Sequence, residues 1–95
     1  MQTYIILSRF TSRTVTDPNE LKSVAKVVSD KIKNECPGIH WKESYALMGR
    51  YDVVDIVEAD DLKEVQKAAM IIRSYGNAAT ETAIATPWHD FLEML

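Results

Sequence analysis

The feature that most constrains this chain is the order in which two kinds of apolar pattern alternate along it. Segments rich in β-branched and aromatic residues predict strands, and segments with apolar residues three or four positions apart predict helices. The predicted strands are 3–10, 39–48, 52–59 and 78–86, and the predicted helices begin after Asp17 and Asp61. The order β-α-β-β-α-β predicts a ferredoxin-like α+β fold with a four-stranded antiparallel sheet.

The helix boundaries carry recognisable capping signals. Asp17 precedes Pro18, which suits the first helical position, and Asp61 offers a second capping carboxylate. Gly76 follows the second helix and is predicted to be its left-handed cap. A polar loop is predicted for 11–16. The apolar stripes at helical spacing are Leu21, Val24, Ala25, Val28 and Ile32 on the first helix, and Leu62, Val65, Ala69 and Ile72 on the second.

Two helices cover one face of such a sheet and leave the other face open. Alternation along 52–59 sorts the strand into two sets, Val54 with Ile56, and Val53 with Asp55 and Val57. We expect the fully apolar set to face the helices. The open face then carries Ile6, Val53 and Val57 around Asp55. Because a large apolar face is unfavourable in water, the sequence predicts a homodimer or a higher assembly of dimers.

Length and composition bound the remaining possibilities. The chain has 95 residues and a net charge of −3, which predicts a single domain over residues 1–95. The acidic balance and the lack of stacking aromatics on the central strands argue against nucleic acid as a partner. No apolar segment approaches the ~20 residues of a membrane span, so no membrane partner is expected. A single cysteine, Cys36, without an export signal predicts a cytoplasmic location.

The last residues form an amphipathic tail. Trp88, Phe91, Leu92 and Leu95 follow the i, i+3, i+4, i+7 spacing of a helix. We therefore expect a short C-terminal helix. It would pack onto a partner subunit or across the end of a barrel that two subunits form, or it would dock on the edge of its own sheet.

Three segments in order carry a family resemblance: Leu47-Met-Gly-Arg-Tyr-Asp-Val-Val54, Glu58-Ala-Asp-Asp61 and Gly76-Asn-Ala-Ala-Thr-Glu-Thr82. The chain resembles the GYD domain family, which is named for its Gly-x-Tyr-Asp signature. It departs from the pattern at Asp60, where proline is usual, and at Ala79, where a basic residue is common. The resemblance implies a ferredoxin-like subunit that dimerises sheet to sheet as an α+β barrel. Similar barrels include cofactor-independent monooxygenases and isomerases, which is an analogy of fold alone.

Asp55 is the first candidate site residue, because a buried carboxylate is unfavourable unless it is paired or protonated. One interpretation is an interface carboxylate paired with Arg9, Lys42 or a tyrosine hydroxyl. The other is a general base with a raised pKa inside an apolar barrel. Such a base would abstract a proton from an acidic C–H bond of a small organic molecule.

The Gly49–Asp52 segment also admits two interpretations. As a hairpin turn, Gly49 would adopt a positive φ and Asp52 would accept hydrogen bonds from turn amides. As a catalytic motif, Tyr51 would serve as acid or donor, Asp52 as base and Arg50 as an anion anchor.

Aromatic side chains on the second strand are the candidate walls of a ligand site. Trp41, Glu43 and Tyr45 share one face by simple alternation, so Trp41 and Tyr45 would line one pocket. Interface packing is the competing role of both aromatics. No cofactor and no metal are predicted, because His40 and His89 lie in different elements and Cys36 has no base beside it.

Two functional classes follow. The first is a protein that binds a small organic molecule in the cleft between the two sheets of the dimer, as a cofactor-independent isomerase or monooxygenase. Its catalytic residues would be Asp55, Tyr51 and Asp52, and its ligand-binding residues Trp41, Tyr45 and Arg50. The second is a non-catalytic ligand-sensing or assembly module. A polar pocket at Asp55 favours ligand chemistry, and a closed apolar seam favours assembly.

Overall fold

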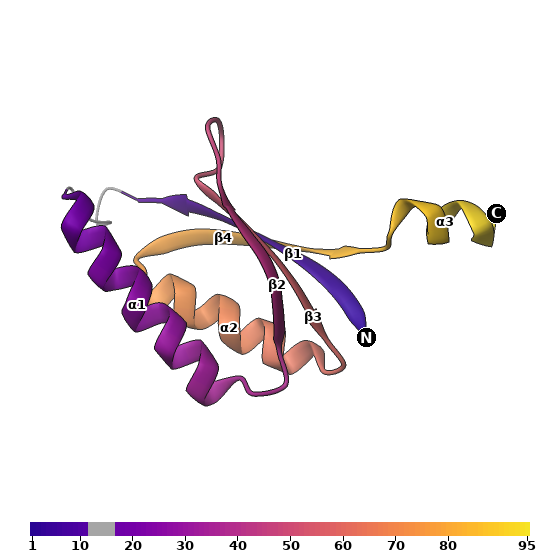
Figure 1. Ribbon diagram of the computed structural model, residues 1–95, viewed down its shortest axis with the longest axis horizontal. Coiled ribbons are helices and arrows are strands. Elements are labelled where there is room, and N and C mark those ends of the chain that lie inside the picture. Colours follow the sequence, from indigo (N-terminus) through magenta and orange to yellow (C-terminus); the bar gives the residue numbers. More distant parts are fainter. Residues whose placement is uncertain (12–16) are drawn as a thin grey trace.

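A computed structural model describes residues 1–11 and 17–95 and shows an antiparallel sheet with helices on one face (Figure 1). The elements are β1 (Gln2–Phe10), α1 (Pro18–Glu35), β2 (His40–Ala46), β3 (Val53–Ala59), α2 (Leu62–Tyr75), β4 (Ala78–Ala85) and α3 (Trp88–Met94). The sheet order is β2-β3-β1-β4, so β1 and β3 are central and β2 is an edge strand, as predicted. The predicted ferredoxin-like fold is confirmed. The loop predicted for 11–16 lies outside the described residues apart from Thr11.

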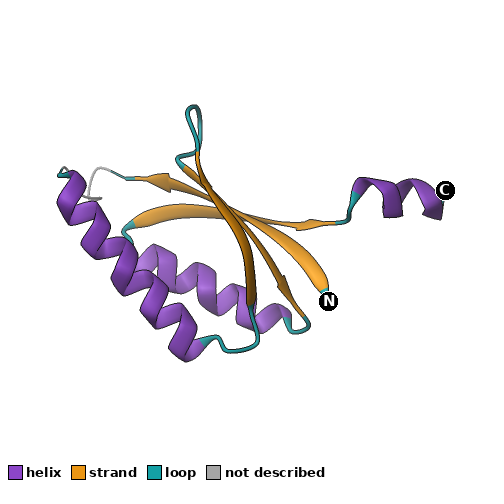
Figure 2. Ribbon diagram, viewed as in Figure 1, coloured by secondary structure: helices purple, strands orange, loops and turns teal. Residues whose placement is uncertain are grey.

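Helices α1 and α2 form one layer and the sheet forms the other (Figure 2). α1 and α2 lie on the same face of the sheet, and α2 packs directly on β3 and β4. The core lies there: Ile6 and Val57 are fully buried, and Val65 of α2 is 1% exposed. Each such side chain contributes roughly 1.5–3 kcal/mol by its removal from water. Within the described residues, no helix is long and apolar enough to cross a membrane.

The helix starts agree with the capping signals, and one helix end does not. Asp17 accepts a hydrogen bond from the backbone N–H of Asn19, and Asp61 accepts one from Lys63, both at 2.9 Å. Gly76 was wrongly predicted to be left-handed, because it has φ −91° and Asn77 takes the positive φ of 50°. Glycine is needed at position 76 for space, since a Cβ there would lie 2.5 Å from the carbonyl oxygen of Ile72.

The two faces of the sheet are the reverse of the prediction. Tyr4, Ile6 and Ser8 are buried toward the helices, and the register pairs Ile6 with Asp55 and Tyr4 with Val57. The helix-covered face therefore carries Ile6, Val53, Asp55 and Val57, and the prediction that they lie on the open face was wrong. The open face carries Ile5, Leu7, Val54 and Ile56, all only half-buried. It is still apolar, through a different set of residues.

An irregularity in β2 separates two aromatic side chains that alternation places together. Trp41 pairs with Val57, but Glu43 pairs with Ile56, so the register shifts between Trp41 and Glu43. Beyond this bulge the strand resumes with its faces exchanged. Trp41 consequently lies on the helix side, and Tyr45 lies on the open face beside Val54. The prediction that Trp41 and Tyr45 line one pocket was wrong for this reason.

α3 projects away from the rest of the chain beyond the end of β4 (Figure 1). Trp88 is 71% exposed and Leu95 is 87% exposed. The rings of Trp88 and Phe91 stack on each other with their centroids 5.7 Å apart. The predicted short helix is present, but it does not dock on the edge of its own sheet. Its apolar side is left for another contact.

Candidate functional site

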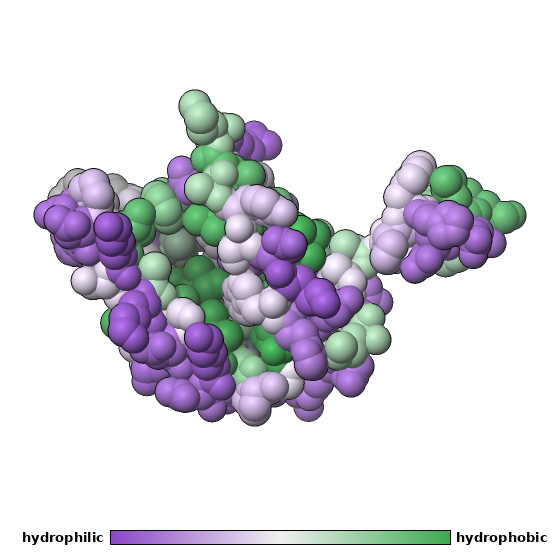
Figure 3. Space-filling view, viewed as in Figure 1, coloured by the Kyte–Doolittle hydropathy of each residue, from purple (hydrophilic) through white to green (hydrophobic). Residues whose placement is uncertain are grey.

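A cavity of about 770 Å³ separates α1 from the β2 and β3 side of the sheet. It forms because the main neighbour of α1 is α2, so the apolar stripe of α1 extends over strands that it does not cover closely. The whole predicted stripe, Leu21, Val24, Ala25, Val28 and Ile32, lines this space. Figure 3 shows the opening as a hollow with hydrophobic atoms at its base, between the hydrophilic outer surface of α1 and β2.

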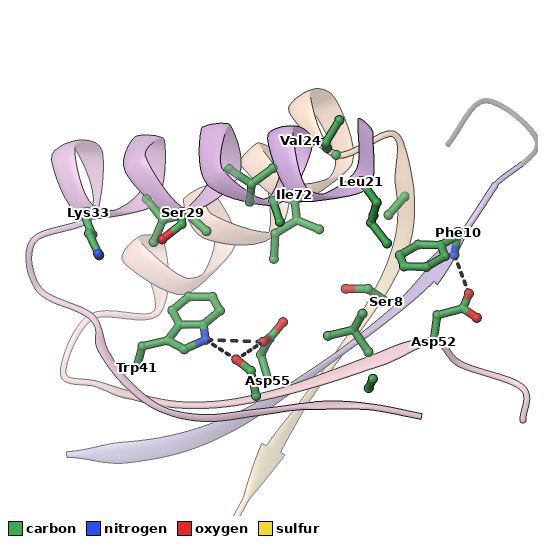
Figure 4. A pocket seen from close by; sticks show the side chains of 18 of the residues that line it. Ser8, Phe10, Leu21, Val24, Ser29, Lys33, Trp41, Asp52, Asp55 and Ile72 are labelled. Carbon is green, nitrogen blue, oxygen red and sulfur yellow. Dashed lines mark hydrogen bonds between the residues drawn. The ribbon is translucent and has the colours of Figure 1, made fainter. Parts of the chain in front are cut away.

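Asp55 provides a carboxylate at the floor of the cavity (Figure 4). Its side chain is 7% exposed, and its Oδ1 accepts hydrogen bonds from Ser44 Oγ at 2.5 Å and from Trp41 Nε1 at 3.3 Å. Trp41 Nε1 also lies 2.9 Å from Ser44 Oγ, which links the three side chains. Burial raises the pKa of Asp55 above its ordinary value, and the bonds from Ser44 and Trp41 oppose that rise. Across residues 1–11 and 17–95, no donor contacts Oδ2 and no cation pairs with this carboxylate.

Ser8 adds a second polar atom to the same wall. It is 4% exposed and forms part of the cavity wall on β1 (Figure 4). No group in the described part of the chain hydrogen-bonds Ser8 Oγ. Ile6 is directly opposite Asp55, so Ser8 is the diagonal neighbour of Asp55 across the β1–β3 pair. Diagonal neighbours of this kind lie about 7–8 Å apart on the same face of the sheet.

Two further charged residues line the cavity, and they lie at its two ends. Lys33 comes from the last turn of α1, and Asp52 immediately precedes β3 (Figure 4). Asp52 Oδ2 accepts a hydrogen bond of 2.7 Å from the backbone N–H of Phe10, so this carboxylate fastens the end of β1. The bond goes to a strand amide instead of the turn amides predicted for Asp52.

Tyr51 and Arg50 belong to a separate, smaller pocket. They line a space of about 350 Å³ together with Arg9, Thr80 and Glu81. The Tyr51 hydroxyl donates to the Glu81 carboxylate, and this bond raises the pKa of Tyr51. The predicted positive φ of Gly49 is confirmed at 147°.

The six predicted site residues are therefore divided among three places. Asp55 and Trp41 lie side by side in the large cavity, and Asp52 lies at its end. Arg50 and Tyr51 lie in the small pocket, and Tyr45 lies on the open face. The position of Asp55 between α1 and the sheet also corrects the expectation of a site between two sheets.

Sequence reasoning missed Ser8 and Ser44. A usable signal existed for Ser8, because Tyr4, Ile6 and Ser8 alternate along one face of a strand. Ser44 carried no such signal, since the bulge after Trp41 determines the face to which it belongs. The carboxylate with its two donors can accept a further hydrogen bond or a proton at Oδ2. In the described residues, no three His, Cys, Asp or Glu side chains gather as a metal site.

Known proteins resemble this chain both in sequence and in structure. The glutamine synthetase and cystathionine β-lyase binding protein of Thermus thermophilus is 31% identical over 99 residues, covering 100% of this chain and 99% of the relative. The crystal structure of a hypothetical protein from Pyrococcus horikoshii is 25% identical, with a TM-score of 0.55 and 94% of each chain covered.

A more distant likeness concerns the fold alone. The feast or famine regulatory protein of Mycobacterium tuberculosis, solved as a complex with L-methionine, has a TM-score of 0.62 at 13% identity. That match covers 92% of this chain and 51% of the regulatory protein, so this chain spans about half its length. The sequence model of the GYD domain family matches residues 4–95, nearly the whole sequence. The chain therefore belongs to the GYD domain family.

Proposed function

We propose that this protein binds a small, mainly apolar molecule in the cavity between α1 and the sheet. The observation that carries the proposal is a cavity of about 770 Å³ whose floor holds a buried carboxylate with one unused oxygen. Protein interiors are close-packed, and voids much larger than a water molecule are few. Ligand sites in proteins have volumes of about 300–1,000 Å³, apolar walls and a small number of placed polar groups.

The composition of the walls supports binding of an apolar body. α1 contributes its whole apolar stripe, and the sheet contributes Val53 and the indole of Trp41. The polar groups are concentrated at one place, where Asp55, Ser44 and Ser8 meet. A ligand would therefore place its polar end on the sheet and its apolar body under α1.

Binding without turnover fits the site better than catalysis. General acid–base chemistry on a C–H bond needs a base and a second group that stabilises the developing charge. Asp55 could be the base, but Trp41 Nε1 and Ser44 Oγ are both directed at its own Oδ1. Among the described cavity residues, the other charged side chains, Lys33 and Asp52, lie at the ends of the cavity. We therefore place the chain in the ligand-sensing class and keep Asp55 as a ligand anchor.

A fragment screen with a blocked variant tests this function. Several hundred small fragments are screened by ligand-observed NMR, and hits are mapped by amide shifts. We expect hits at Asp55, Ser44 and α1 that are lost in Ala25→Trp, which fills the cavity. Val27→Trp is the matched control, because Val27 lies on the same helix, is 48% exposed and does not line the cavity. Hits that map to the open sheet face and survive Ala25→Trp would contradict the proposal.

We also propose that the open sheet face pairs with a second copy of the chain. Its apolar centre consists of Ile5, Leu7, Val54 and Ile56, and no helix in the described part of the chain covers them. The exposed side of α3 would extend such an interface, since Trp88 and Leu92 are 71% and 47% exposed. The 31% identical relative is named as a binding protein of two enzymes, which supports an assembly role for this family. The dimer and the ligand cavity use opposite faces of the sheet, so the two proposals are independent.

A further inference from the structure

We propose that the ligand of the cavity carries a hydrogen-bond-donating head, a hydroxyl or an ammonium group, which binds between Asp55 Oδ2 and Ser8 Oγ. This inference rests on the proposed function and adds the chemical class of the ligand. Apolar alcohols and amines belong to the class, and carboxylic acids and ethers do not.

The first argument is that the two oxygens of Asp55 differ in their hydrogen-bond partners. Oδ1 already accepts from Ser44 Oγ at 2.5 Å and from Trp41 Nε1 at 3.3 Å. These two donors fix the orientation of the carboxylate, so Oδ2 has a defined direction. In the described residues, no protein donor reaches Oδ2. An ionised carboxylate only accepts hydrogen bonds, and so its partner must be a donor.

The second argument is Ser8. Ser8 is only 4% exposed, and no group in the described residues hydrogen-bonds its Oγ. A serine hydroxyl both donates and accepts. It can therefore donate to a ligand hydroxyl or accept from a ligand ammonium while the same head group donates to Asp55. One head group then satisfies both polar atoms of the wall.

The third argument is what the site excludes. A ligand carboxylate would place a second negative charge directly against the carboxylate of Asp55, and like charges at such short range repel. An ether offers only acceptors and would leave Oδ2 unpaired while removing water from it. Lys33 could attract an anion, but it lies at the end of α1, away from the carboxylate at the floor.

Four probes with one apolar body test the inference. Naphthalen-2-ylmethanol has a hydroxyl head, naphthalen-2-ylmethylamine an ammonium, 2-(methoxymethyl)naphthalene an ether and 2-naphthoate a carboxylate. Dissociation constants are measured by titration calorimetry at neutral pH, and the bound position is mapped by amide shifts. We expect the alcohol or the amine to bind about tenfold or more tightly than the ether, as is typical of one hydrogen bond to a charged group. The ranking of the alcohol against the amine identifies which head the site takes.

Two variants attribute the preference to named atoms. In Asp55→Asn, the oxygen of the amide must stay on Ser44 and Trp41, so its NH₂ group takes the place of Oδ2. The preference for donor heads should vanish, and the ether should gain relative to the alcohol. Ser8→Ala should reduce the preference by a smaller factor. Circular dichroism and thermal unfolding verify that each variant is folded.

The outcomes separate the inference from the function on which it rests. Probes that map to the cavity with equal affinity, or with the carboxylate tightest, would overturn the donor-head inference and leave the ligand site in place. A donor preference that persists unchanged in Asp55→Asn would overturn it as well. If none of the four probes maps to the cavity, the proposed function fails, and the inference fails with it.

Discussion

Ser8 offers a sharp test of the energetics of the cavity, because its hydroxyl is buried without a protein partner in the described chain. Replacing Ser8 by alanine removes that hydroxyl and leaves the backbone pairing of β1 with β3 unchanged. An unpaired buried hydroxyl destabilises a protein by about 1–3 kcal/mol. Removing the hydroxyl should therefore stabilise the protein, although the lower strand propensity of alanine offsets a few tenths of a kcal/mol of this gain. We expect Ser8→Ala to raise the free energy of unfolding by about 1 kcal/mol, or the melting temperature by about 4–8 °C for a domain of this size.

Ser44→Ala is the matched control, because it is the same substitution on the same cavity. The Ser44 hydroxyl donates to Asp55 at 2.5 Å, so its removal should lower stability by about 1.5 kcal/mol. Urea denaturation of the three proteins without added ligand, followed by circular dichroism, gives both differences. Opposite signs are the expected result. A loss of stability in Ser8→Ala would show that the hydroxyl makes a bond in the folded state and would refute the reasoning.

Three further predictions concern charge, assembly and the tail. Burial raises the pKa of Asp55 above 3.8, so the folded state holds this proton to higher pH than the unfolded chain, and stability falls as pH rises through that window. Urea denaturation midpoints at pH 4 and 7 should show that Asp55→Asn becomes more stable relative to the wild type as the pH rises. An equal difference between the two proteins at both pH values would contradict the prediction. Ile56→Glu, in the open face, should convert a dimer to a monomer in light scattering at micromolar concentration, whereas Val27→Glu on α1 should not. A chain that ends at Thr86 should lose less than about 1 kcal/mol of stability as a monomer, because α3 has no buried residue. Its dimer should dissociate more readily than that of the full chain. A large loss of stability in the monomer would contradict the prediction.

Most of the fold could be predicted, because its signals are local. Asp17 and Asp61 cap the helices through contacts within two residues of themselves. The strand order places β2 at an edge, as its polar sequence indicates. Gly76 was misjudged because its requirement is a close approach to the Ile72 carbonyl, and spacing does not reveal such contacts.

The site was harder to predict, because its sides depend on packing between distant elements. The prediction put the more apolar side of β3 against the helices. In the structure, the helix side holds the polar set of Asp55, Ser8 and Ser44, since α1 leaves a cavity over them. The bulge after Trp41 adds a second inversion that depends on pairing with β3. Asp55 and Trp41 were both candidates, and only the structure shows that they lie together in the cavity.

The attachment of α1 to α2, with a cavity where the sheet would otherwise support it, has a consequence for dynamics. A helix held along one side has few contacts with the strands to lose when it moves outward, and its C-terminal part, with Ile32, is the part that joins the buried core. Amide hydrogens of the part of α1 that precedes Val28 should then exchange through a partial unfolding, faster than those of Ile6 and Val57. A ligand that bridges α1 and the sheet would slow this exchange selectively. Binding would then be recorded as a change in the mobility of one helix, while the rest of the subunit keeps its shape.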